Sequence, residues 1–220
     1  MAHRLSHLFS PADLERVKAA VKEAEKKTSG EIVPYVVDHS DEYEEAEWRC
    51  GALFGTLTLA VFAAVHRFTS VWLPLDFAEV VLLSLLAFLS GMGLARFFPP
   101  VKRLFAGNAL LDRRVALRAA DAFVAEEVFK TRDRTGILLF LSVLEHKVLV
   151  VGDEGINARV EKLDWQEVVS TIVEGVKAGK PADGLVEAIG KCGALLDRHN
   201  VSIRRDDTDE LPDSLRIRQR

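Results

Sequence analysis

Two long uncharged segments constrain this chain more than any other feature of its 220 residues. They run from Cys50 to Val65 and from Val80 to Ala95. Each is somewhat shorter than the ~20 residues that cross a bilayer. Neither has the polar face that a helix packed on a soluble core would show to water, although two buried core helices are the alternative interpretation. The pattern predicts a transmembrane helical hairpin over residues 50–98.

The residues that flank these segments support the same interpretation. Aromatic rings and arginines at both ends are typical of a membrane interface. The flanking residues are Trp48, Arg49, His66, Arg67, Phe68, Trp72, Arg96, Phe97 and Phe98. The lipid bilayer is therefore the first expected partner of the chain, through residues 50–98.

The basic residues predict the orientation of this hairpin. The connection carries only Arg67 and the titratable His66, whereas the side of both termini carries Arg49, Arg96, Lys102, Arg103, Arg113 and Arg114. Arginine and lysine near a span favour the cytoplasmic side, and acidic residues count little. Both termini and the soluble part are therefore expected in the cytoplasm. The acidic stretch 38–47 is expected to be a solvated linker. Glu79, near the second span, is interpreted as an interfacial carboxylate or as the partner of a cation in the membrane.

Composition excludes several classes of protein. The formal net charge is −4, and no repeat of basic and aromatic residues appears, so a nucleic-acid partner is not expected. Cys50 and Cys192 lie far apart without a CxxC or Cys/His spacing. Neither a disulfide framework nor a zinc site is therefore indicated.

The sequence on either side of the hairpin alternates between helical and strand patterns. Ser10 and Pro11 open an amphipathic helix over 10–28. The β-branched run from Glu31 to Val37 follows as a strand, in which Pro34 favours an edge position or a bulge. After the hairpin, the pattern predicts a helix over 113–130, strands over 136–143 and 145–151, and helices over 157–163, 164–177 and 181–198.

This order predicts an α/β fold. The strand at 136–143 is apolar on both sides, so helices must cover both faces of the sheet. We expect a three-layer sandwich with a central mixed sheet flanked by helices, interrupted by the two-helix transmembrane hairpin. The predicted parts are 1–49 and 99–200 for the two halves of the domain, 50–98 for the hairpin, and 201–220 for a charged tail that is mobile or loosely docked.

Several segments together resemble the TPM domain family. They are "SPADLERVKAAVKEAEKKTSGEIVPYVV", "RTGILLFLSVLEHKVLVVGDEGI", the tryptophan of "LDWQEVV" and "GKPADGLVEAIGKCGALL". The resemblance covers roughly residues 8–199, and the chain looks most like the bacterial membrane-anchored branch. It implies a mixed sheet between helices, a bacterial inner-membrane location, often a calcium site at one end of the sheet, and an acid phosphatase activity claimed for plant members.

Carboxylates gather at one predicted end of the sheet. If strands 31–37 and 136–143 are parallel and 145–151 runs back, the acidic residues at their ends share one rim, which comprises Glu31, Asp133, Asp153 and Glu154. Oxygen ligands of this kind suit calcium. The spacing lacks the regularity of a dedicated calcium loop, so a solvated turn is the favoured interpretation and a calcium site is the alternative.

The sequence offers little for catalysis. Its histidines are scattered, no serine or cysteine lies in a recognisable nucleophile motif, and Gly152 and Gly155 do not form a phosphate-binding loop. Trp165 is expected in the core rather than against a ligand. The favoured hypothesis is a non-enzymatic, membrane-tethered module that binds a partner, such as another membrane protein. The alternatives are a metal-dependent phosphomonoester hydrolase and a calcium-responsive binding domain.

Overall fold

The computed structural model describes residues 8–68, 75–161, 163–199, 201 and 210–218. The chain divides into two compact units. The α/β unit comprises residues 1–41 and 112–220, and the hairpin unit comprises residues 42–111. Trp72, one of the flanking aromatic residues, and residues 202–209 of the tail lie outside the described residues.

A four-stranded mixed sheet is the centre of the α/β unit. Its strands are β1 (Glu31–Val37), β2 (Gly136–Ser142), β3 (Lys147–Gly152) and β4 (Arg216–Arg218), in the order β3-β2-β1-β4. β1 is parallel to β2 and to β4, whereas β2 and β3 are antiparallel. The predicted mixed sheet, with parallel first and second strands and a returning third strand, is confirmed.

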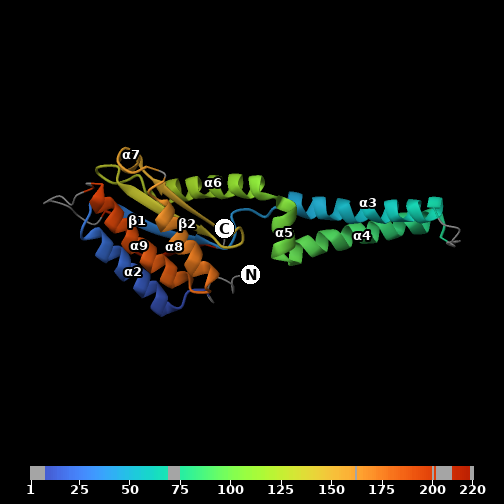
Figure 1. Ribbon diagram of the computed structural model, residues 1–220, viewed down its shortest axis with the longest axis horizontal. Helices are drawn as coiled ribbons and strands as arrows, with labels where there is room; N and C mark the ends of the chain where they lie inside the picture. Colours follow the sequence, from blue (N-terminus) through green and yellow to red (C-terminus); the bar gives the residue numbers. More distant parts are fainter. Residues whose placement is uncertain (1–7, 69–74, 162, 200, 202–209, 219–220) are drawn as a thin grey trace. The chain divides into compact units, whose positions relative to one another are not determined.

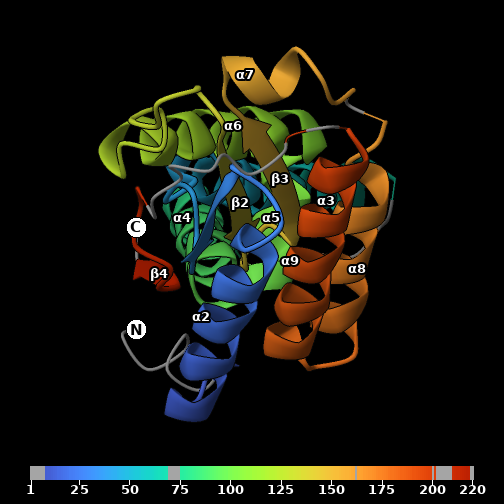
Figure 2. The same cartoon turned by 90° about the vertical axis from the view of Figure 1, so that its left-hand side faces the viewer.

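Helices cover both faces of this sheet, as predicted (Figures 1 and 2). The helices α2 (Pro11–Glu25), α8 (Gln166–Lys177) and α9 (Pro181–Arg198) lie on one face, and α6 (Asn108–Ala125) lies on the other. Successive residues of β2 enter opposite cores because a strand alternates its side chains. Leu139 faces the first set of helices, Leu138 faces α6, and Trp165 is buried in the first core, as expected.

Two local predictions differ from the structure. The helix predicted over 157–163 is instead the short α7 (Glu154–Asn157), which begins earlier because Asp153 caps it. Pro34 lies in β1, an inner strand rather than an edge strand. β4 pairs with β1 only from Tyr35 onward. No strand of the described chain therefore needs a hydrogen bond from the Pro34 nitrogen, which has no proton to donate.

The charged tail is docked where it is described, and the prediction of a mobile or loosely docked extension is wrong for these residues. β4 adds an edge strand to the sheet. Arg216 is buried, donates to the carbonyls of Pro212 and Ser214 at 2.6 and 2.7 Å, and lies 3.4 Å from Glu126. Arg218 also pairs with Glu126, at 3.1 Å, so both arginines of β4 form ion pairs with the domain.

The hairpin unit consists of α3 (Glu44–Phe68), α4 (Phe77–Phe97) and the short α5 (Pro99–Ala106). α3 and α4 are long and apolar enough to cross a membrane. Only 17% of the most apolar stretch of each is buried, whereas the core helices of a soluble protein are mostly buried. Glu79 completes a capping box with Asp76 at the start of α4, and both interpretations of this residue stay predictions.

Candidate functional site

The strand register brings the predicted acidic residues to one rim of the sheet. Glu31 lies opposite Gly136, and the Asp153 N–H donates to the Gly136 carbonyl at 2.9 Å. Each of the two buried carboxylates, however, has its own protein partners. Among the described residues, no three His, Cys, Asp or Glu side chains are grouped so that they could hold a metal ion.

Glu31 holds the C-terminal segment. It is buried, and its two carboxylate oxygens accept hydrogen bonds from the backbone N–H groups of Glu210 and Leu211, at 3.2 and 3.3 Å. Leu211 enters the core on the α6 face of the sheet. The sequence could not assign this role to Glu31 because its partners lie about 180 residues away and are backbone groups.

Asp153 organises the turn after β3. It is buried, accepts from the Glu154 N–H at 2.8 Å, and forms a 2.9 Å ion pair with Arg134. Gly155 N–H donates to the Arg134 carbonyl at 2.9 Å, and a side chain at Gly155 would collide with the carbonyl of Asp133. The Asp-Glu-Gly sequence is therefore built to pack α7 on the 133–134 loop.

The expectation of a solvated turn is accordingly wrong for Asp153, because its carboxylate is buried and caps α7. Glu154 is exposed. Asp133 is also exposed. Calcium binding at Glu31, Asp133, Asp153 and Glu154 stays a prediction, and two of these four carboxylates already accept hydrogen bonds from the chain itself.

A second polar cluster lies at the opposite end of the same strands. Ser142 ends β2, and its hydroxyl donates to the carboxylate of Glu145. Ser40 Oγ lies 2.8 Å from Ser142 Oγ, and the Ser40 N–H donates to Glu145 at 2.8 Å. All three residues are buried. Since the Ser142 proton points to Glu145, the Ser40 hydroxyl donates to Ser142, and a chain of two hydroxyls ends on one carboxylate.

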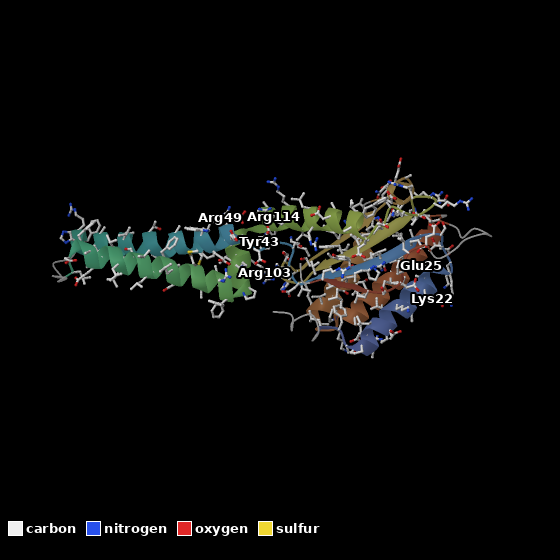
Figure 3. All side chains as sticks on the ribbon, turned by 180° about the vertical axis from the view of Figure 1, so that it is seen from behind. Lys22, Glu25, Tyr43, Arg49, Arg103 and Arg114 are labelled. Atoms are coloured by element: carbon white, nitrogen blue, oxygen red, sulfur yellow. The ribbon has the colours of Figure 1, made fainter. Side chains whose placement is uncertain are left out.

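This cluster borders a cleft of about 340 Å³, which is lined by Ser40, Asp41, Arg114, Leu117, Arg118 and Asp121. The cleft lies at the carboxyl ends of β1 and β2, where ligands of parallel sheets commonly bind. α6 provides both arginines one turn apart. Arg114 Nε lies 2.7 Å from Asp41 Oδ2 in an ion pair, and Figure 3 labels this arginine on α6.

Arg118 differs from its neighbour Arg114 in lacking an ion pair within the part of the chain that the structure describes. Its Nε atom is buried and has no hydrogen-bond partner there. A buried guanidinium donor without an acceptor carries a desolvation cost. An anionic group that entered the cleft would supply the missing acceptor. No local pattern predicted this site, because the hairpin separates Ser40 from Arg118, and a further strand separates Arg118 from Glu145.

Cys192 is not a nucleophile. Burial raises the pKa of its thiol, and the nearby Glu25 carboxylate raises it further. The thiol therefore stays protonated, and a protonated thiol is a poor nucleophile. Glu25 accepts from the Ile32 N–H at 2.7 Å and joins the end of α2 to β1; Figure 3 labels it on α2 beside Lys22.

Polar contacts also organise the base of the hairpin unit. Glu47 is buried on α3, 2.9 Å from Lys102 of α5 and 3.4 Å from Arg96 of α4. One carboxylate thus joins all three helices of this unit. The expectation of a solvated acidic linker over 38–47 is therefore wrong for Glu47, since α3 already begins at Glu44 and turns this residue inward.

Comparison with known proteins agrees with this fold. Residues 108–195 match the family model described as the TPM domain. This stretch of the chain is similar to the TPM domain. The matched segment runs from α6 to near the end of α9 and includes Arg114, Arg118 and Glu145, while β1, Ser40 and the two long apolar helices lie outside it.

A solved structure shares the fold of this chain. It is the NMR structure of the BA42 protein from the psychrophilic bacterium Bizionia argentinensis, with 20% sequence identity and a TM-score of 0.57. The alignment covers 95% of this chain and 94% of BA42. No curated protein matches the chain.

Proposed function

We propose that this chain is a membrane-anchored TPM module that binds a partner without transforming it. The anchor would be α3 and α4, and the observation that supports it most directly is the exposure of their apolar surface. Leu57 on α3 and Leu82, Leu85 and Leu89 on α4 are about half exposed. In water such a surface would be strongly unfavourable, whereas in lipid it needs no further cover.

We place the α/β unit on the cytoplasmic side. Arg49, Arg96 and Lys102 lie at one end of the hairpin unit, and Arg67 lies near the other. Positive residues near the ends of spans are retained on the cytoplasmic side. The location that follows is a bacterial inner membrane, with both termini in the cytoplasm.

The cleft beside Arg118 is the binding surface in this proposal. Arg118 lacks a carboxylate partner among the described residues, so the proposed partner presents an anionic group to it. A charge-assisted hydrogen bond to a guanidinium is stronger than a neutral one. The proposed partner is another protein of the same membrane, which the anchor would hold at high local concentration.

One observation favours a second candidate, the hydrolysis of phosphomonoesters. Ser40 lines the cleft, and its hydroxyl is joined through Ser142 to a buried carboxylate. Such a chain could draw the proton from an attacking hydroxyl. Glu145 reaches the Ser40 hydroxyl only through Ser142, however, and accepts directly from the Ser40 N–H, which fits a structural role better.

Membrane residence and orientation are tested together. The full-length chain should stay in the membrane pellet after an alkaline carbonate wash. A reporter fused after Arg220 should behave as cytoplasmic, and one inserted near Ser70 should lie outside. Recovery of the chain in the wash would refute the anchor, and digestion of the α/β unit from outside intact spheroplasts would reverse the orientation.

Binding and catalysis are separated by two variants of the cleft. Arg118→Gln should reduce cross-linking to its partner in detergent-solubilised membranes at least tenfold, as loss of one buried ionic contact would (about 1.4 kcal/mol). Arg113→Gln, on the exposed side of the same helix, is the control. Ser40→Ala should leave binding intact. A phosphatase activity of the parent that Ser40→Ala abolishes would instead establish the enzymatic candidate.

A further inference from the structure

α5 is joined to the hairpin at a sharp change of direction. Phe98 ends α4 and begins α5 in an extended conformation (φ −113°, ψ 101°), and two prolines follow it. A residue before proline disfavours the helical region, so α4 cannot continue through this point. α5 consequently runs across the direction of α3 and α4 rather than along it (Figure 1).

Two cationic side chains hold α5 in this position. Lys102 Nζ donates to Glu47 Oε1 and to the Glu42 carbonyl, both at 2.9 Å. Arg49 Nη1 donates to the carbonyls of Phe105 and Ala106, at 3.1 and 3.2 Å. These are last-turn carbonyls that a helix leaves without an internal partner. Arg49 and Arg103 are labelled at this end of the hairpin in Figure 3.

Several large apolar side chains near this junction are exposed. Phe97, Phe98 and Leu104 are 75%, 55% and 76% exposed, and Trp48 on the first turns of α3 is exposed as well. We call these four residues the collar. An eight-residue helix is not stable by itself in water, and a set of exposed aromatic and leucine side chains indicates an interaction surface.

We propose that the collar is embedded in the interfacial layer of the membrane, with α5 lying in the membrane plane. The aromatic and leucine side chains would enter the boundary between headgroups and acyl chains, while Lys102 and Arg103 stay at headgroup level. This inference rests on the proposed anchoring. The inference adds to the proposed anchoring a role for α5, which would set the depth of the hairpin in the membrane.

The lipid interface fits the collar better than a protein partner does. Phe97 is the last residue of α4, so the collar continues directly from the apolar surface of a candidate span. Tryptophan, phenylalanine and basic residues are the side chains that the headgroup region favours, and short amphipathic helices lie in this plane. Glu47 balances the charge of Lys102 in an ion pair, which lowers the cost of placing α5 at the membrane interface.

Spin-label depth measurement tests this placement on the full-length chain. Labels would be attached to Leu104→Cys, to Leu85→Cys in the apolar stretch of α4 and to Leu117→Cys on α6, in vesicles of phosphatidylcholine and phosphatidylglycerol. Accessibility to oxygen and to a water-soluble nickel chelate gives the depth of each label. Leu104 should lie about 5–10 Å below the headgroups, Leu85 deeper, and Leu117 in water.

The outcomes separate the collar from the anchor. A Leu104 label as accessible to nickel as the Leu117 label, with Leu85 still deep, would overturn the collar and leave the anchor intact. A Leu85 label in water would refute the anchor itself. A Leu104 label shielded from both reagents would show a protein surface covering the collar, which also overturns the proposal.

A second variant tests whether the hairpin holds α5. Lys102→Gln removes the ion pair with Glu47 and leaves Arg49 in place. The Leu104 label should then become more mobile and its depth less defined. Unchanged mobility and depth in this variant would overturn the inference that α5 is fixed by Glu47 and sets the depth of the anchor.

Discussion

The two units of this chain bury opposite kinds of residue. In the α/β unit, large aliphatic side chains such as Ile137, Leu139 and Leu141 are fully buried between the sheet and its helices. In the hairpin unit, the buried positions of α3 and α4 are mostly small or polar, and the leucines are exposed. These buried residues are Ala46, Glu47, Cys50, Gly51, Gly55, Val80, Ser84, Gly91 and Ala95.

This difference shows that the hydrophobicity of a segment alone does not predict whether its leucines are buried or exposed. The central strand and the two long helices are all rich in leucine, yet the leucines are buried in one unit and exposed in the other. The proposed lipid environment of the hairpin would account for this difference. Close approach of the hairpin helices depends instead on glycine. A side chain at Gly91 would come within 2.8 Å of the Cys50 carbonyl oxygen.

The largest expected effect comes from separating the two units. Residues 42–111 would be replaced by a short glycine-serine linker between Asp41 and Asp112. The ends can be joined because Asp41 contacts Arg114 at 2.7 Å. The variant should remain in the supernatant of an ultracentrifuge run without detergent and unfold in one cooperative step, because its two cores lie within the α/β unit. Aggregation of the variant would show that the α/β unit needs the hairpin for stability.

The next test exchanges one leucine in each unit. Leu139→Ala should lower the stability of the α/β unit by about 2–5 kcal/mol, since it opens a cavity in a packed core. Leu85→Ala, at a half-exposed position, should change hairpin stability in detergent by only ~0.5 kcal/mol. Denaturant unfolding followed by circular dichroism measures both. Equal losses at the two sites would mean that Leu85 packs against protein.

Glycines of α4 provide a smaller and more local test. Gly91→Ala should destabilise the hairpin by about 1–3 kcal/mol because the added methyl group would meet the α3 backbone. Gly93→Ala is the matched control, with nothing within 4 Å of the added carbon. This control should be neutral or stabilise the helix by up to about 1 kcal/mol. Similar losses in both variants, measured by thermal melting in detergent, would contradict the observed helix packing.

The sequence predicted those features that depend on local patterns. β1 matches its predicted span from Glu31 to Val37, α9 matches the predicted helix at 181–198, and the mixed sheet follows from the order of elements. Contacts over long sequence distances were not predictable. Glu31 binds the backbone of Glu210, Ser40 contacts Ser142, and β4 adds to the sheet, and none of these partners leaves a periodic signal.

The acidic rim provides the smallest expected effect and the sharpest test of calcium binding. Asp153→Asn retains a side chain that can cap α7 and loses the ion pair with the half-exposed Arg134, so it should cost no more than about 1 kcal/mol. Glu154→Gln changes an exposed residue and should cost no more than ~0.5 kcal/mol. Calcium should leave both values unchanged, because the Asp153 carboxylate is already engaged by the Glu154 N–H and Arg134.

If the rim held calcium, a concentration one hundred times the dissociation constant would stabilise the parent by about 2.7 kcal/mol. A calcium-dependent rise in melting temperature that is present in the parent and lost when both substitutions are combined would therefore establish the cation site.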